Sequence, residues 1–201
     1  MSSYLVIQST SKMLEQVLRQ AYAADADFAV DTSSQDAISF NNPTETAKNS
    51  SHKLSIWLYQ VTENEFLKNQ PPLRVNGTDD RQRQPPLALN LYYLVTPFTG
   101  ESMMDYLLLG KTMQVFYENA IIPLRSSGDE VSEELHLTLC RLSLEELTRI
   151  WEALKEPYRL SVCYQVRVNR IEPVSDRTQR RITSQRDSYR EMPQPNEWAT
   201  P

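Results

Sequence analysis

Histidine and cysteine are the side chains best suited to metal or nucleophilic chemistry, and the chain has only two of each. His52 and His136 have no HExxH or CxxC pattern around them, the spacings that bring zinc ligands together. At about 3.3 Å per residue, His136 and Cys140 would lie about 13 Å apart along a strand, too far to share an ion without other ligands. A cysteine nucleophile needs a base beside it, and Cys140 or Cys163 could meet a histidine only by an accident of the tertiary fold. We therefore expect no metal site and no catalytic cysteine.

The other common catalytic patterns are also missing from the sequence. No GxSxG segment is present, so the turn that exposes a serine nucleophile in one large hydrolase class is not expected. Phosphate-binding loops need clustered glycines, and these are dispersed: Gly77, Gly100, Gly110 and Gly128. Adjacent carboxylates such as Glu145 and Glu146 are typical of solvated charges at a helix start. The sequence thus predicts a protein that is not an enzyme and has no cofactor.

Composition indicates one folded domain with an appended tail. The 201 residues are 40% hydrophobic and 23% charged, as in ordinary globular proteins. A net charge of −5 gives no basic field, so nucleic acid is not an expected partner. We see no signal peptide and no run near the roughly 18 apolar residues that cross a bilayer, so no direct membrane insertion is expected. Two cysteines are too few for a disulfide scaffold, which favours reduced thiols and the cytoplasm.

Alternation of apolar and other residues predicts strands with period two. In one of them Leu54, Ile56 and Leu58 share a face, and both faces are usable, which is typical of a strand covered on both sides. The predicted strands are 53–61, 87–96, 135–141 and 161–170. We expect an α/β (α+β) domain with one largely antiparallel mixed sheet.

Spacing of three and four residues predicts three flanking helices, over 10–24, 102–120 and about 143–155. The last begins with a capping box made by Ser143 and Glu146. The helix over 102–120 is apolar nearly all round, so we expect it to be buried, either inside the domain or between subunits.

Two polar excursions interrupt these elements. Residues 31–51 are polar apart from Ile38 and Phe40, which could form a short strand in a surface excursion. Residues 62–84 contain two prolines in succession and an Asn-Gly pair, which predicts a long loop or a protruding hairpin. Loops of that length usually have a function.

No helix or strand periodicity continues after residue 173. Residues 174–201 hold five arginines against four acidic residues, so this tail carries +1 and the rest of the chain −6. We therefore divide the chain into a domain over 1–173 and a polar, Arg-rich C-terminal arm over 174–201. An arm that orders only on a partner and a solvated arm both fit; few aromatic residues accompany the arginines, which disfavours nucleic acid.

An aromatic cluster leaves a second class of function open. Trp57, Tyr59, Tyr92 and Tyr93 could line a groove, although packing in the core is the more ordinary role. A small-ligand-binding or hydrolytic domain is therefore one alternative. A deep pocket with convergent, perturbed groups would favour it, and a flat surface with extended arms would favour assembly.

Four segments resemble the successive blocks of the N-terminal domain of cap, or tail-terminator, proteins of phage-tail-like contractile injection systems. The resemblance covers roughly residues 5–173, and its order and spacing make it fairly specific. The segments are LSIWLYQVTENEFLKN (54–69), PPLALNLYYLVTPF (85–98), YLLLGK (106–111) and LSLEELTRIWEALKEPYRLSVCYQVRV (142–168).

The resemblance implies a structural cap that assembles as a homohexamer ring on the distal end of the tail. It implies tail sheath and inner tube proteins as partners, and assembly in the cytoplasm into a particle that is later released or anchored. Some members of the family are larger, so the functions of their extra regions are not carried over. Another assembly factor of the same machine, a tube-length or baseplate adaptor, is a second alternative.

We expect the 62–84 excursion and the C-terminal arm to make the assembly contacts, with the 102–120 helix packed centrally. Strand addition and extended arms are common ways of joining subunits. The candidate contact residues are all arginines: Arg74, Arg81, Arg83, Arg177, Arg180, Arg181, Arg186 and Arg190.

Overall fold

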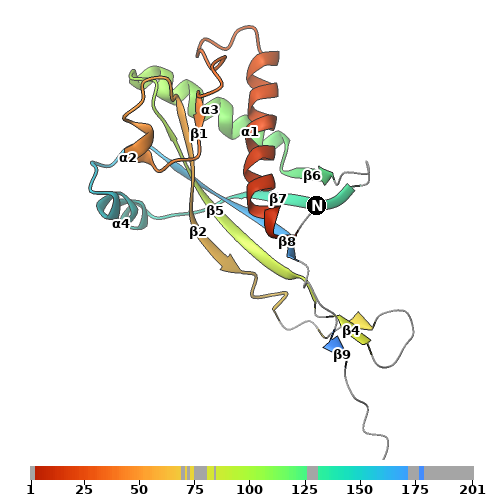
Figure 1. The fold of residues 1–201 in the computed structure, drawn as a ribbon. Helices are drawn as coiled ribbons and strands as arrows, with labels where there is room; N and C mark the ends of the chain where they lie inside the picture. Colours follow the sequence, from red (N-terminus) through yellow and green to blue (C-terminus); the bar gives the residue numbers. More distant parts are fainter. Residues whose placement is uncertain are drawn as a thin grey trace, which may run out of the picture.

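The structure is a computed structural model that describes residues 3–68, 71, 73–74, 81–83, 85–125, 131–171 and 177–178. Its centre is a six-stranded sheet in the order β1-β2-β5-β8-β7-β6, in which only the β1–β2 pair is parallel. This mixed, largely antiparallel sheet with flanking helices confirms the predicted fold class (Figure 1). The strands are β1 (Ile38–Ser39), β2 (Leu54–Glu63), β5 (Leu87–Pro97), β6 (Ile121–Arg125), β7 (Val131–Leu139) and β8 (Val162–Ile171).

The central strand β5 is covered on both faces for most of its length. Leu91, Tyr93 and Val95 point into the main core, whereas the alternate residues Leu94 and Thr96 are equally buried on the opposite face. The prediction that both faces of β2 are covered is right only for the first half of the strand. Its second half emerges towards solvent, with exposed side chains at residues 60, 61 and 63.

Two long helices, α1 (Val6–Ala24) and α3 (Ser102–Glu118), cover one face of the sheet (Figure 1). Helix α1 begins at Val6, four residues earlier than predicted, because the apolar stripe already starts there. Its buried side chains are spaced by four residues and lie on one side of the helix: Val6, Thr10, Leu14, Leu18 and Tyr22. This stripe is the side of α1 that packs into the core beside α3.

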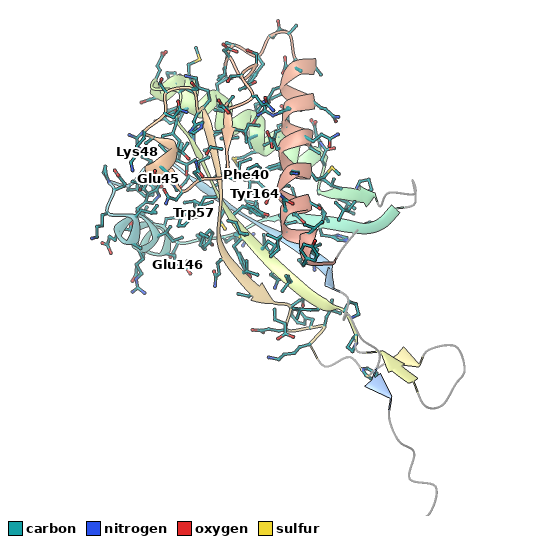
Figure 2. All side chains as sticks on the ribbon, in the orientation of Figure 1. Phe40, Glu45, Lys48, Trp57, Glu146 and Tyr164 are labelled. Atoms are coloured by element: carbon teal, nitrogen blue, oxygen red, sulfur yellow. The ribbon has the colours of Figure 1, made fainter. Side chains whose placement is uncertain are left out.

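The third predicted helix, α4 (Leu144–Leu154), lies on the other side of the sheet from α1 (Figure 1). Its predicted capping box is confirmed: the Ser143 hydroxyl accepts from the Glu146 amide, and the Glu146 carboxylate accepts from the Ser143 amide at 2.7 Å. Trp151 is buried, and its indole N–H donates to the Ser161 hydroxyl at 3.2 Å. Figure 2 shows Trp57 on the α4 side of the sheet.

Three short elements differ from the sequence expectation. The strand expected near Ile38 exists as β1, but it is buried against β2 instead of lying in a surface excursion. The one-turn helix α2 (Pro43–Thr46) follows it and is capped by Asn42. The edge strand β6 was not predicted, because Pro123 interrupts its short apolar run; proline is tolerated at sheet edges, where no neighbour needs its amide.

Helix α3 is not buried all round within this chain. The alternative in which the whole helix is buried inside the domain is therefore wrong. One side packs into the core through Leu108, Val115 and Phe116. The opposite side is open, and its large side chains are exposed within this chain: Met103 (68%), Tyr106 (55%), Leu107 (43%) and Tyr117 (86%).

A buried hydroxyl pair joins α1 to α3. The Thr112 hydroxyl donates to the Leu108 carbonyl oxygen at 2.6 Å, so its own proton is already used. The Tyr22 hydroxyl lies 2.6 Å from the Thr112 oxygen and must therefore be the donor of that bond. Burial raises the pKa of Tyr22, which keeps this hydroxyl protonated.

Thr112→Val should destabilise the protein more than Tyr22→Phe. The first change leaves the buried Tyr22 hydroxyl without an acceptor, at a cost of about 1–3 kcal/mol, whereas the second removes one bond worth roughly 1 kcal/mol and leaves Thr112 paired. Urea unfolding followed by circular dichroism measures both free energies of unfolding. The double variant should recover part of the Thr112→Val loss. Equal losses in the two single variants would show that the assigned donor direction is wrong.

Candidate assembly surface

A second, three-stranded sheet lies beyond the ends of the central strands. It has the order β3-β4-β9 and consists of β3 (Leu73–Arg74), β4 (Arg81–Arg83) and β9 (Arg177–Thr178). In the chain β3 follows β2, β4 precedes β5 and β9 follows β8, so the small sheet repeats the order of the three central strands. Figure 1 shows β4 and β9 well away from the helices. We call this sheet the projecting sheet.

The projecting sheet unites two segments that the sequence analysis treated as separate contact elements. Strand β4, from the 62–84 excursion, pairs with both β3 and β9, and β9 comes from the start of the C-terminal arm. The hairpin alternative for the excursion is confirmed by the antiparallel pairing of β3 with β4. The pairing with β9 was missed, since two strands of two or three residues carry no periodicity that links them across the sequence.

Arginine dominates the projecting sheet: four of its seven strand residues are arginine, and none of the seven is acidic. The register sets each arginine opposite a neutral residue. Its pairs are Leu73 with Arg83, Arg74 with Gln82, Arg81 with Thr178 and Gln82 with Arg177. Like charges directly opposite each other destabilise a strand pair, and this register avoids that arrangement.

The candidate contact arginines are therefore divided by the structure. Arg74, Arg81, Arg83 and Arg177 come together in the projecting sheet, although they span more than half of the chain. The other four lie outside the described residues: Arg180, Arg181, Arg186 and Arg190.

The exposed side of α3 is a second candidate surface. The sequence predicted it only as one of two alternatives, a helix buried between subunits. Gly110 lies in the middle of its apolar stripe, and a Cβ atom added there would meet nothing within 4 Å. The stripe is bordered by the ion pair between Lys111 and Asp25, whose atoms are 2.5 Å apart. The hydrogen bond from Lys111 lowers the pKa of Asp25, which favours its carboxylate form. The surface is thus apolar, open at Gly110 and edged by charge.

The aromatic cluster does not form one site. Tyr93 is 1% exposed and belongs to the main core, and its hydroxyl lies 2.9 Å from that of Ser11 in α1. Trp57, Tyr59 and Tyr92 are half-buried on the other face of the sheet, with neighbouring ring centroids 6.0 and 6.3 Å apart. The core interpretation is right for Tyr93, and the other three form a partly open aromatic face.

The aromatic face lines neither of two cavities in the described part of the chain. One, of about 530 Å³, lies by Arg19, Tyr22 and Phe28, and the other, of about 360 Å³, lies by Asp25, Tyr106 and Lys111. Among the described residues, no three His, Cys, Asp or Glu side chains are grouped to hold a metal ion. No helix in the described part of the chain has the length and apolar character needed to cross a membrane.

Comparisons with solved structures find the same fold in two proteins. One is the PVC sheath/tube terminator of an extracellular contractile injection system in its extended state, at 18% identity and a TM-score of 0.59, covering 93% of this chain and 64% of that one. The other is the tube-terminating cap of the anti-feeding prophage, at 18% identity and a TM-score of 0.56, covering 87% and 60%. This chain thus spans less than two thirds of either, and no curated protein matches it significantly.

The family comparison covers nearly the whole chain. The match is to the Pvc16 N-terminal domain and runs over residues 9–185, which includes every described strand and all of α1 except its first residues. It agrees with the resemblance found in the sequence, and extends into the arm as far as residue 185. The chain belongs to the Pvc16 N-terminal domain family.

Proposed function

We propose that this protein is a non-enzymatic structural cap that ends the inner tube and sheath at the distal end of a contractile injection system, as a hexameric ring. Family membership and the fold shared with two terminators support this role. The observation that carries it is the projecting sheet, where arginines from the excursion and the arm gather on a chain whose net charge is −5. A basic projection from an acidic body is suited to docking on a partner with acidic groups.

Capping requires two different contacts, one to the tail and one between neighbouring subunits. A stack of identical rings ends with surfaces that would recruit the next ring, and a subunit that matches this end but presents another outer face stops growth. Subunits around a ring meet through two unlike surfaces, and the ring closes when the rotation permits. A cap therefore needs surfaces that its own fold leaves uncovered.

We assign the tail contact to the projecting sheet and the C-terminal arm. In this proposal residues 1–173 form the body, and residues 174–201 form the arm that docks on sheath and inner tube proteins. Two features of the described part favour this: short strands with open outer edges, which a partner strand can extend, and arginines that can hold carboxylates in bidentate pairs.

We assign the contact between neighbouring subunits to the exposed side of α3. Four large apolar side chains on one helix side are costly to leave in water and are typical of a protein interface. Gly110 allows a neighbouring backbone to approach closely. In this proposal the helix is buried between subunits, which is the second alternative predicted from the sequence. Assembly would begin in the cytoplasm.

Reversing the charge of arm arginines should weaken docking without changing the fold. We expect the triple variant Arg177→Glu, Arg180→Glu and Arg181→Glu to bind tail particles at least tenfold more weakly. The melting temperature should stay unchanged, because β9, which holds Arg177, lies outside the main core. Co-sedimentation with purified tails lacking this protein measures the binding. A matched control reverses three exposed charges of the body: Lys12, Lys48 and Arg149. Equal binding of both triple variants and the wild type would contradict the assignment of the arm.

A charge placed in the α3 surface should prevent ring formation. Leu107→Glu puts a carboxylate where we expect an apolar contact, and burying it unpaired would cost several kcal/mol. Light scattering after size-exclusion chromatography should show the sixfold mass for wild type and a single-chain mass for the variant. The control is Leu144→Glu, the same exchange at another exposed leucine, where the first turn of α4 accepts a carboxylate. If Leu107→Glu keeps the wild-type mass, α3 is not the subunit contact.

A further inference from the structure

The two cysteines lie opposite each other where β7 and β8 meet. Leu139 is paired with Tyr164 in this antiparallel ladder, so the next pair along is Cys140 with Cys163. The Cys140 amide donates to the Cys163 carbonyl oxygen at 2.8 Å, which fixes that register beyond the end of β7. Opposite residues in antiparallel strands have Cα atoms about 4.5–5.5 Å apart, within the roughly 4.4–6.8 Å that a disulfide spans. Both thiols are free in the structure.

The two thiols differ in their surroundings. Cys163 is 2% exposed, and its sulfur lies 3.2 Å from the Tyr59 hydroxyl on the aromatic face. Cys140 is only half-buried. A hydrogen bond with the Cys163 thiol lowers the pKa of Cys140, whereas the same contact, together with burial, raises the pKa of Cys163. Cys140 is therefore the accessible thiol with the greater thiolate character, and Cys163 is the shielded one.

We propose that Cys140 and Cys163 form a redox-reactive pair, in which Cys140 is the thiol that reacts with a small-molecule disulfide and Cys163 is the resolving thiol. The geometry for this is a cross-strand pair in which Cys140 is partly exposed and Cys163 is buried. Neither residue belongs to the surfaces assigned to capping, and the reaction does not depend on the proposed function.

The chemistry proceeds by two exchanges. The Cys140 thiolate attacks one sulfur of a disulfide such as oxidised glutathione, forming a mixed disulfide and releasing one glutathione thiolate. The Cys163 thiol then loses its proton and attacks the Cys140 sulfur, which releases the second glutathione. The protein loses two protons and two electrons, and the reagent is reduced to two thiols.

The crosslink would close residues 141–162, including α4, into a covalent loop between the paired ends of β7 and β8. A disulfide stabilises a fold by restricting the unfolded chain, so the oxidised protein should melt at a higher temperature than the reduced protein. In the reducing cytoplasm the pair stays open, and it closes where oxidants are present. Transfer from the reducing cytoplasm to oxidising surroundings would follow from the proposed role in an injection particle. The reactivity of the cysteine pair does not depend on that role.

Intact-mass spectrometry of the folded protein with oxidised glutathione tests the proposal. Wild type should lose two hydrogens and carry no adduct, and peptide mapping should join Cys140 to Cys163. Cys163→Ser should stop at one glutathione adduct on Cys140, because the resolving thiol is gone. Cys140→Ser should stay unmodified, since its remaining thiol is buried.

Circular dichroism establishes that each variant is folded, and Cys163→Ala serves as the resolving-thiol variant if the serine variant is not. A stable glutathione adduct on wild type would overturn the assignment of Cys163 as the resolving thiol. An unreactive wild type, or modification of Cys163 in Cys140→Ser, would overturn the reactivity assigned to Cys140. Both outcomes are independent of any test of capping.

Discussion

The central strand β5 must keep its backbone paired on two sides and its side chains buried on two faces, and the rest of the molecule follows from that requirement. Its edges are satisfied by β2 and β8, which form its two antiparallel ladders. One face is covered by α1 and α3, and the other faces towards α4. When the three strands leave this cover they lose their apolar partners, and their continuations pair again as the projecting sheet. The projecting sheet is thus an extension of the three central strands.

The same requirement explains which surfaces remain uncovered. Helix α3 uses one side to seal the sheet, and its outer side keeps four large apolar residues exposed, of which Met103 and Tyr117 are the most exposed. The projecting sheet has no helix over it in Figure 1. One surface is apolar and the other is basic, so they favour different partners. An apolar side suits a permanent neighbour such as another subunit, and a basic extension suits docking on a finished tail.

Local patterns in the sequence were sufficient for the main elements, since burial imposes its period on each one. Alternation along β5 and the capping box of Ser143 and Glu146 both predicted what the structure shows. The failures have long-range causes. Because α3 is apolar nearly all round, its sequence does not reveal which side the sheet covers. Pro123 interrupts the apolar run of β6, so this strand was not predicted. The pairing of Gln82 with Arg177 joins segments that are distant in sequence and too short to carry a period. For the candidate site, residue type could be predicted, whereas the gathering of the arginines could not.

The most direct test of the capping role is electron microscopy of particles from cells that lack this protein, scored for tail length and for a distal density. A cap predicts that the distal density is lost and that tails are abnormally long, unstable or missing. Reintroducing the intact chain should restore both the density and the tail length. Tails of normal length that keep their distal density would contradict the account.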